Sequence, residues 1–285
     1  MTEQDRPTET PQDDVEPASK PTPAPAPAVP ARPLTDLAAA IGFLTLLPIG
    51  RTWPDDRAPR SVGWYGWIGW ILGTAAVLPL TLLKGRVELH AMPQALLAGV
   101  LVVTAWALLT RFLHWDGLAD SFDGIWGGHT PERRLEIMRD SHIGAFGIIA
   151  IVLVALVQVA CVTVLVSKGV FWPLLAAPVA ARFSLSLAAW ELPAARPDGL
   201  GRSAIGYAGR YERLVAGASL LALLVCLSLG ATSRQFIWVV AAGVIAGLAV
   251  PRMLSKPVGG MTGDLFGATV VLIETIVLLT AAVIL

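Results

Sequence analysis

The sequence predicts an all-α, polytopic integral membrane protein, and three observations lead to that class. Hydrophobic residues make up 55% of its 285 residues and charged residues only 15%, whereas soluble domains carry roughly 25% charged residues. Eight apolar runs follow one another after a polar N-terminal segment. Lysine and arginine are concentrated in alternate connections between those runs. We therefore expect a bundle of about seven transmembrane helices and one short N-terminal segment that is re-entrant or spanning.

Residues 1–33 form a tail of different composition. They contain the stretch PASKPTPAPAPAVPARP, with acidic residues upstream of it. They lack the apolar h-region and the basic n-region of a signal peptide. A stretch so rich in proline and alanine is typical of a disordered, partly polyproline segment. We therefore predict a disordered tail over residues 1–33 and a membrane-embedded domain over residues 34–285.

The apolar runs define the predicted helices. Their bounds are Leu37–Ile49, Val62–Leu83, Gln94–Phe112, Gly144–Ser167, Val170–Trp190, Leu214–Gly230, Phe236–Leu254 and Leu265–Leu285. A membrane helix needs about 20 residues, with about 17 as the lower limit, so all runs but the first and the borderline sixth have ample length. The first run is short, is interrupted by Gly42 and has Pro48 near its end. We expect this run to be re-entrant or interfacial, with spanning as the alternative.

The charge distribution predicts the topology. Counted from the second run onward, the connections 51–61, 113–143, 191–213 and 255–263 share one face of the membrane. With the adjoining helix ends, that face carries 13 lysines and arginines, and the opposite face carries four. Because loops rich in these residues tend to stay in the cytoplasm, we expect the first face and its polar clusters to be cytoplasmic.

Composition also excludes some classes of function. The formal net charge is zero, and nucleic-acid binding needs a dense basic face that this chain lacks. The two cysteines, Cys161 and Cys226, both lie inside apolar runs. Buried free cysteines behave as small hydrophobic residues, so we expect neither a disulfide nor a cysteine metal site.

The stretch HWDGLADSFDG concentrates three carboxylates, Asp116, Asp120 and Asp123, between two apolar runs. On a helix, this i, i+4, i+7 spacing places them on one face, within about 60° of each other. Like charges at that spacing repel, and oxygen ligands without cysteine favour a hard cation such as Mg²⁺. Gly117 and Gly124 would let a diphosphate approach the backbone. The alternative interpretation is a solvated acidic loop.

The next polar segment, GGHTPERRLEIMRDSHIGAFG, predicts a turn, a short cytoplasmic helix and the entry into a span. Thr130 followed by Pro131 marks the start of that helix, as N-cap and first helical residue. Arg133, Arg134 and Arg139 can bind phosphates or anchor the helix at lipid headgroups.

Asp140 and Ser141 lie at the mouth of the following span. They add a fourth candidate carboxylate, with a hydroxyl beside it, for metal or substrate. An ordinary polar boundary between helix and span is the alternative.

A third cluster, WELPAARPDGLGRSAIG, is a loop punctuated by glycine and proline. The free amides near Gly199 and Gly201, together with Arg196 and Arg202, suit an anionic ligand. Arg182 differs because it lies inside an apolar run, where ionisable residues are usually functional. Snorkelling of its guanidinium to the headgroups is the alternative.

The last cluster opens the final span. Asp264 follows three glycines and can reach a shared metal site from another helix, with Gly267 allowing close packing. Glu274 lies about 15 Å deeper along the axis and can face a polar cavity or pair with Arg182. His114 and His142 flank the acidic cluster and can orient a phosphate, act as acid or base, or form a structural hydrogen bond.

Four blocks carry a resemblance to a known family. HWDGLADSFDG, RRLEIMRDSHIGAFG, RPDGLG and GGMTGDLFGA occur in that order, and they resemble cobalamin synthase, the adenosylcobinamide-GDP ribazoletransferase family, over residues 34–285. The resemblance implies a multi-pass, Mg²⁺-dependent transferase of the bacterial cytoplasmic membrane with its active site facing the cytoplasm. It would join α-ribazole, or its 5′-phosphate, to adenosylcobinamide-GDP and release GMP. Other enzymes of the pathway would be its neighbours.

The resemblance also implies roles for individual residues. The predicted metal ligands are Asp116, Asp120, Asp123 and Asp264. The predicted proton acceptor is Asp123 or Asp140, and Asp140 is a further candidate ligand. The predicted substrate-binding residues are Arg139, Ser141, Arg182, Arg196, Gly199, Gly201 and His114.

Two rival functions fit parts of the same pattern. A CDP-alcohol phosphotransferase also uses aspartates and glycines at a membrane helix end, but the Ala-Arg step and the long Gly-Asp-Asp spacing of that group are missing here. A cation transporter would place its acids near the bilayer midplane, whereas these acids fall in a predicted cytoplasmic connection.

Overall fold

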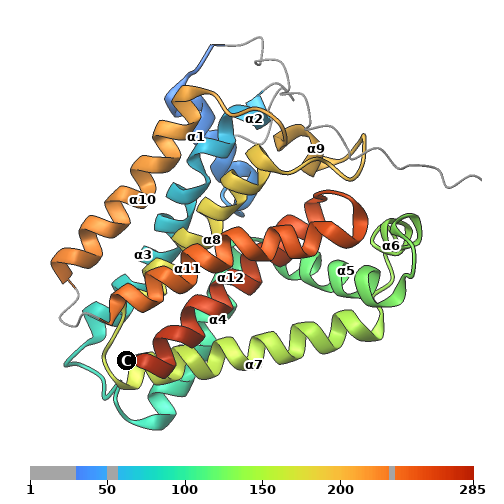
Figure 1. The fold of residues 1–285 in the computed structure, drawn as a ribbon. Helices are drawn as coiled ribbons and strands as arrows, with labels where there is room; N and C mark the ends of the chain where they lie inside the picture. The colour runs from blue at the N-terminus through green and yellow to red at the C-terminus, as the bar shows by residue number, and fades with distance from the viewer. Residues whose placement is uncertain (1–29, 50–56, 231–234) are drawn as a thin grey trace, which may run out of the picture.

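The computed structural model describes residues 30–49, 57–230 and 235–285. Apart from two isolated bridges, the regular elements of this described part are helices (Figure 1). The α-helices are α1 (Pro33–Leu44), α2 (Ala58–Ser61), α3 (Tyr65–Leu83), α4 (Met92–Leu109), α5 (Leu113–Gly127), α6 (Pro131–Ile137), α7 (Ala145–Ser167), α8 (Trp172–Glu191), α9 (Leu200–Ala204), α10 (Arg210–Gly230), α11 (Phe236–Ser255) and α12 (Gly263–Ile284). Two short 3-10 helices, Val62–Trp64 and Lys256–Val258, precede α3 and follow α11. The all-α prediction is confirmed.

Seven helical segments of the described part are long and apolar enough to cross a membrane. They contain α3, α4, α7, α8, α10, α11 and α12. These match the seven longer apolar runs of the sequence. The first predicted run, Leu37–Ile49, is helical only up to Leu44. It lies partly in α1, whose 12 residues extend only about 18 Å at 1.5 Å per residue, which is too short to span. Residues 1–29 of the predicted tail lie outside the described residues, so its disorder stays a prediction.

Helices α8 and α12 form the centre of the bundle (Figure 1). Protein buries 78% of the most apolar 18-residue stretch of α8 and 56% of that of α12, against 28–39% in the other five spans. Helix α8 packs on α3, and α12 packs on α5, α7, α8 and α11. A Cβ at Gly69 of α3 would lie 2.5 Å from the carbonyl oxygen of Pro178 in α8. Glycine therefore lets these two backbones touch, as in many membrane helix pairs.

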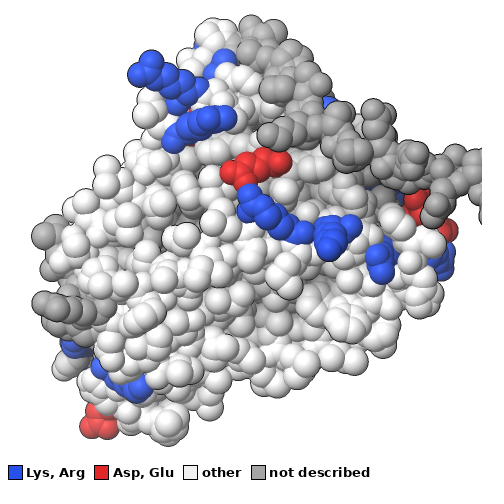
Figure 2. Space-filling model, viewed as in Figure 1, with Lys and Arg blue, Asp and Glu red and all other residues white. Residues whose placement is uncertain are grey.

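The distribution of charged side chains agrees with a membrane-embedded bundle. On the face shown in Figure 2, charged residues gather along the end that holds α6 and the start of α10, and a second group lies at the opposite end. The surface between them is free of charge on this face. Exposed arginines at the first end include Arg202, Arg210 and Arg213, whereas Lys84 and Arg86 lie exposed at the second. The two ends are the expected headgroup regions.

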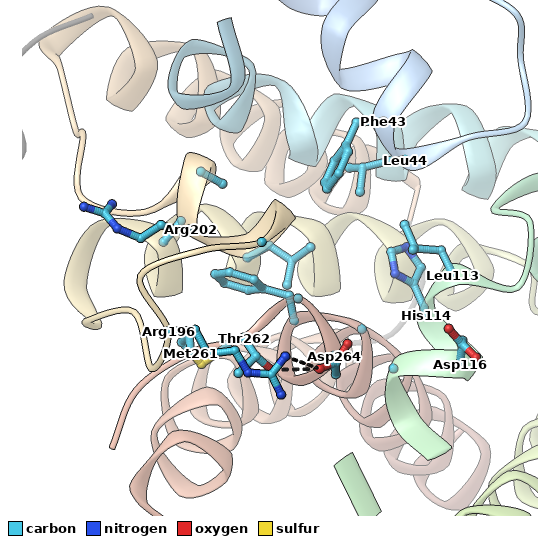
Figure 3. A pocket seen from close by; sticks show the side chains of 18 of the residues that line it. Phe43, Leu44, Leu113, His114, Asp116, Arg196, Arg202, Met261, Thr262 and Asp264 are labelled. Carbon is cyan, nitrogen blue, oxygen red and sulfur yellow. Dashed lines mark hydrogen bonds and ion pairs between the residues drawn. The ribbon is translucent and has the colours of Figure 1, made fainter. Parts of the chain in front are cut away.

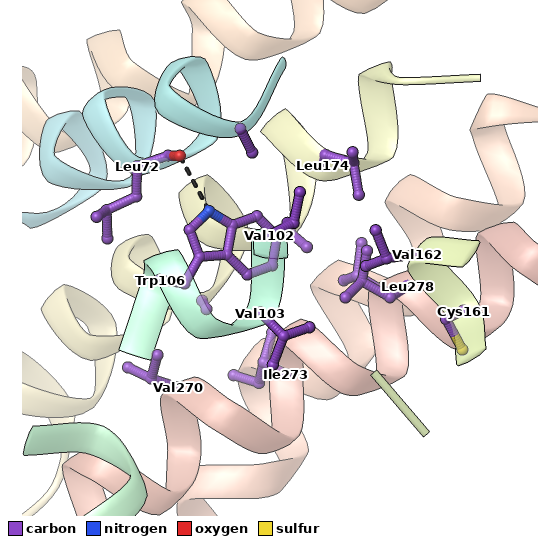
Figure 4. Packing of buried hydrophobic residues seen from close by; sticks show 14 of the residues in the cluster. Leu72, Val102, Val103, Trp106, Cys161, Val162, Leu174, Val270, Ile273 and Leu278 are labelled. Carbon is purple, nitrogen blue, oxygen red and sulfur yellow. Dashed lines mark hydrogen bonds between the residues drawn. The ribbon is translucent and has the colours of Figure 1, made fainter. Parts of the chain in front are cut away.

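The buried core contains an indole whose polar group is satisfied. Trp106 of α4 is 4% exposed and packs among Val102, Val103 and Ile273 (Figure 4). Its indole nitrogen donates a hydrogen bond of 3.0 Å to the carbonyl oxygen of Leu72 in α3. Because a buried N–H without a partner is costly, this bond fixes α4 against α3.

A backbone break separates α4 from α5. Arg111 and Phe112 adopt positive φ angles of 53° and 56°, a region that residues other than glycine rarely occupy. After the break, α5 packs on α7. The two helices are close, since a Cβ at Gly147 of α7 would lie 3.0 Å from the side chain of Ala119 in α5. The acidic motif is therefore a helix packed against the bundle and not a free loop.

Candidate active site

A cavity of about 200 Å³ opens between α1, α3, α5, α8, the loop before α9 and the start of α12 (Figure 3). Its wall includes His114, Asp116, Arg196, Gly199 and Asp264. Residues from the acidic motif HWDGLADSFDG, from the loop WELPAARPDGLGRSAIG and from the start of the final span thus meet at one place. Although some of their residues lie 150 positions apart in the sequence, the packing of α5 on α12 brings them together.

Glycines allow α5 and α12 to approach closely. A Cβ at Gly117 would lie 2.6 Å from the backbone oxygen of Asp264, and one at Gly267 would lie 3.2 Å from the backbone of His114. The prediction that Gly267 permits close packing is confirmed. Gly117 also lines the cavity, so its approach to a diphosphate stays a prediction, whereas Gly124 does not line the cavity and protein atoms fill the space beside it. At Gly124, a Cβ would lie 2.5 Å from the Met138 side chain.

The four acids predicted as metal ligands share one electrostatic environment. Burial, and then the carboxylates around it, raise the pKa of Asp120 to about 7, whereas the Arg196 guanidinium opposes that shift. Those carboxylates belong to Asp116, Asp264 and Asp123. Arg196 lies 3.7 Å from Asp264, and within the described residues neither Asp116 nor Asp120 has an ion pair. Among the described residues, Arg196 is therefore the one cation in ion-pair range of Asp116, Asp120 and Asp264, and this group of acids carries an excess of negative charge.

This excess fits a divalent cation that also binds substrate. In the part of the chain that the structure describes, no three Asp, Glu, His or Cys side chains are close enough to hold a metal ion by themselves. The predicted ligands do not form a complete protein cage. Mg²⁺ usually binds one or two carboxylates, waters and substrate phosphates, so Asp116, Asp120 and Asp264 remain suitable ligands.

Asp123 has a different set of partners. Its two carboxylate oxygens accept hydrogen bonds from the backbone amides of Gly144 at 2.7 Å and Gly147 at 2.9 Å. These amides belong to the N-terminus of α7, and Asp123 is 7% exposed. The carboxylate thus satisfies two N–H groups that the helix itself leaves free, next to the positive end of its dipole. The structure supports a capping role, and metal binding or proton transfer by Asp123 stays a prediction.

Substituting Asp123 by Asn tests the capping role. The amide can accept only one of the two backbone bonds, and the charge is lost, so we expect α7 docking to weaken by about 1.5–3 kcal/mol. The Mg²⁺ concentration for half-maximal activity should change little in the protein that remains folded. Thermal unfolding and an Mg²⁺ titration measure the two effects, with the exposed Glu132→Gln as control. A normally stable variant with weakened Mg²⁺ dependence would instead identify Asp123 as a ligand.

Arg196 and Arg202 are the predicted arginines that the structure brings into the cavity wall, and Arg196 lies beside Asp264. It donates a hydrogen bond of 2.9 Å to the backbone oxygen of Leu135, which fastens the loop to α6. Burial lowers the pKa of its guanidinium, and its Nε is buried without a hydrogen-bond partner. Gly199, with a positive φ of 93°, also lines the cavity, and Gly201 lies in the first turn of α9.

Other predicted residues lie at the rim or outside the cavity. Asp140 and Ser141 are exposed in the turn between α6 and α7. The Asp140 carboxylate accepts hydrogen bonds from the amide and the ring of His142, and these bonds lower its pKa. Arg139 forms an exposed ion pair of 2.8 Å with Asp198, a residue of the cavity wall. Catalysis by Asp140 is therefore not supported by its position.

Arg134, a predicted candidate for phosphate binding, does not line the cavity. It donates hydrogen bonds to the backbone oxygens of Gly128 at 2.9 Å and Pro257 at 2.8 Å. It therefore joins α6 to the segment before α12.

Arg182 does not line the cavity, although its charge acts on His114 in the cavity wall. It is 1% exposed and forms an ion pair with Glu274, which is 5% exposed. A residue of α12 thus takes up its charge inside the bundle, and substrate binding by Arg182 stays a prediction. The alternative that Glu274 pairs with Arg182 is confirmed.

His114 lies in the cavity wall, as predicted. Its side chain is 4% exposed, and its Nε2 has no hydrogen-bond partner. Burial and then the charge of Arg182 hold the pKa of His114 well below its usual value. A neutral imidazole with one free nitrogen therefore faces the cavity.

The sequence interpretation missed several residues of the wall. Thr262 caps α12 by accepting the Leu265 amide at 3.2 Å, and it donates to Asp264 at 3.4 Å. Its position just before an apolar run is a recognisable N-cap signal. Phe43 and Leu44 of α1 also line the cavity, and no local pattern in the sequence indicated this.

A helical membrane bundle that gathers carboxylates and an arginine around one cavity at its polar end is the arrangement of a membrane-embedded enzyme for an anionic substrate. The particular family follows from comparison with known proteins. Residues 36–282 match the family model described as cobalamin-5-phosphate synthase, and the chain belongs to that family.

Curated relatives agree with this assignment. The adenosylcobinamide-GDP ribazoletransferase of Syntrophobacter fumaroxidans is 39% identical over 85% of this chain and 96% of the relative. Enzymes of the same name from Bradyrhizobium diazoefficiens and Chlorobium chlorochromatii are each 35% identical, over 87% and 88% of this chain and 94% and 97% of the relative. No solved structure matches the chain. Neither rival family considered from the sequence is supported by these matches.

Proposed function

We propose that this chain transfers α-ribazole, or its 5′-phosphate, to adenosylcobinamide-GDP and releases GMP, with Mg²⁺ as cofactor. The relatives that carry this activity in their names match nearly their whole length. The observation in the structure that carries the proposal is the cavity where Asp116 and Asp264 meet Arg196. A diphosphate bound with a divalent cation would balance that set of charges.

The roles of the charged residues follow from their positions. Asp116, Asp120 and Asp264 would hold Mg²⁺ against the diphosphate of the donor. When bound there, Mg²⁺ supplies Lewis-acid stabilisation of the leaving phosphate and a template for the substrate. Arg196, partly buried beside Asp264, binds a phosphate oxygen and stabilises the charge that develops during transfer.

The transfer breaks the phosphoanhydride bond of the donor and forms a phosphate ester. A ribose ring hydroxyl that is free in both ribazole and its 5′-phosphate attacks the phosphorus that carries the cobinamide arm, and the bond from that phosphorus to the bridging oxygen, which leaves with GMP, breaks. The hydroxyl proton passes to a carboxylate of the cavity wall, and GMP leaves as the anion. Asp116 and Asp264 line the wall, whereas Asp123 is engaged with α7. We therefore prefer a wall carboxylate as proton acceptor.

The proposed orientation places the cavity at the cytoplasmic face of a bacterial membrane. The four connections on that face and the adjoining helix ends carry 13 lysines and arginines, against four on the other face. The nucleotide-linked donor and Mg²⁺ would then reach the cavity from the cytoplasm, where other enzymes of the pathway would be neighbours. Lipid would contact the uncharged belt of the bundle.

A reconstituted assay tests this function. The purified protein in lipid nanodiscs, supplied with adenosylcobinamide-GDP, ribazole and Mg²⁺, is expected to release GMP in equal amounts with the cobalamin product. Release should stop when ribazole is omitted or Mg²⁺ is chelated. GMP release that does not depend on ribazole would indicate a hydrolase and contradict the proposal, as would CMP release from a CDP-alcohol.

A further inference from the structure

One side of the cavity is apolar and has no part in the transfer chemistry described above. It is lined by Phe43, Leu44, Tyr65, Leu185 and Phe266. Phe43 and Leu44 lie across the cavity from Arg196 and Asp264 (Figure 3). The Phe43 and Tyr65 rings are stacked, with centroids 6.2 Å apart and planes 20° apart. The wall therefore combines a charged side for phosphate with a flat aromatic side.

Helix α1, which contributes Phe43 and Leu44, is fixed to the bundle at both ends. At its start, Asp36 forms a buried ion pair of 3.1 Å with Arg57. Past its end, the Leu46 amide donates a bond of 2.7 Å to the backbone oxygen of Leu109, at the end of α4. Buried contacts of this kind hold a side chain in place before a ligand arrives. The apolar side is thus a preformed surface.

Resting on the proposed function, we propose that this apolar side binds the aromatic base of the acceptor, a planar benzimidazole, and that Phe43 and Leu44 of α1 select which base is accepted. The ribose ring hydroxyl that attacks the donor would then extend across the cavity toward Asp116 and Asp264. One cavity would thereby hold the base and present the attacking oxygen to the charged side.

The guanine of the donor is the competing occupant, and its chemistry fits less well. Guanine presents several donors and acceptors along its edge, and each one costs free energy if it is buried without a partner. Phe43, Leu44, Leu185 and Phe266 offer no side-chain polar atom, and Tyr65, whose ring stacks on Phe43, is only 4% exposed. A benzimidazole has a single free ring nitrogen, so its burial there is far less costly.

His114 supplies one polar group next to this wall. Its buried Nε2 has no partner in the structure and belongs to the same cavity. The free ring nitrogen of a benzimidazole nucleoside is an acceptor, and an imidazole N–H is a donor. A hydrogen bond between them would satisfy both groups and orient the base in the cavity.

Two substitutions in α1 test the subsite. Phe43→Ala removes the stacking surface, so KM for ribazole should rise about tenfold, while KM for adenosylcobinamide-GDP stays within about twofold. Leu44→Phe narrows the cavity. The ratio of kcat/KM for the riboside of unsubstituted benzimidazole to that for the riboside of dimethylbenzimidazole should therefore rise about tenfold. Phe43→Leu is the milder variant if Phe43→Ala does not fold. Phe146→Ala, at an aromatic residue of α7 that is 46% exposed and outside the cavity, is the matched control.

A binding measurement separates this inference from the proposed function. Equilibrium dialysis of radiolabelled ribazole against the nanodisc protein should show about tenfold weaker binding for Phe43→Ala than for the parent and the Phe146→Ala control. If the parent binds ribazole in this Phe43-dependent way but releases no GMP, the subsite stands and the transfer proposal fails. A rise in KM for the donor alone would place guanine on the apolar side and overturn the inference. Unchanged ribazole binding and unchanged KM would overturn it too.

Discussion

Replacing Asp120 by Asn is expected to lower the rate of GMP release by about 10²–10³-fold, the usual cost of losing one group that stabilises charge in a transition state. Asp120 lies among the carboxylates of Asp116, Asp123 and Asp264, and its pKa is raised to about 7. The variant keeps the shape of the side chain and removes one negative charge that Mg²⁺ and the diphosphate would need. The initial rate of GMP release across an Mg²⁺ titration measures the effect.

The same substitution should not destabilise the metal-free protein. A carboxyl whose folded-state pKa is raised from 3.8 to about 7 weakens the fold as pH rises through that interval, because its charged form is disfavoured in the native state. Asparagine removes that penalty at neutral pH, so the unfolding temperature without Mg²⁺ should stay the same or rise. Glu88→Gln, an exposed acid at the opposite end, is the charge-removal control. Near-normal turnover by Asp120→Asn would contradict the metal proposal.

Hydropathy predicted the spans because burial in lipid depends on local composition. The seven long runs became seven long apolar helices, and the glycine-interrupted run is helical only up to Leu44, in the short α1, before it reaches Pro48. Each of these outcomes depends on residues within one window of about 20 positions. The contribution of α1 to the cavity depends instead on contacts with α2 and the end of α4, which no window contains.

The acidic motif shows where spacing stops being informative. Asp116, Asp120 and Asp123 do share a broad face of α5, but two different helices meet that face. Asp116 faces the cavity beside α12, and Asp123 meets the N-terminus of α7. A spread of about 60° around a helix axis is enough to reach different neighbours. The sequence therefore predicted the kind of charge at this place but could not assign a separate partner to each acid.

Arg182 shows the same limit inside the membrane. Its position in an apolar run correctly marked it as unusual, because a buried charge must be compensated. Its partner Glu274 lies 92 positions further along the chain, and only the packing of α8 on α12 brings the two together. The sequence left substrate binding and pairing both open, and the structure favours pairing.

Removing one partner of that pair is expected to destabilise the fold strongly. Glu274→Leu leaves the Arg182 guanidinium buried and uncompensated, and its Nε already lacks a hydrogen-bond partner. Breaking a buried ion pair in this way costs about 3–5 kcal/mol. The free energy of unfolding in mixed micelles, and the amount of protein recovered from membranes, should both fall well below those of the parent.

The double variant Arg182→Met with Glu274→Leu separates stability from function. Replacing both charges by apolar side chains of similar size removes the uncompensated charge, and such replacements are often neutral or stabilising. We therefore expect the double variant to regain most of the lost stability and to release GMP at a rate close to that of the parent, since neither residue lines the cavity. A double variant that is stable but inactive would show that the Arg182 charge, and not the ion pair alone, serves the reaction. That result would support the role in substrate binding that the sequence suggested.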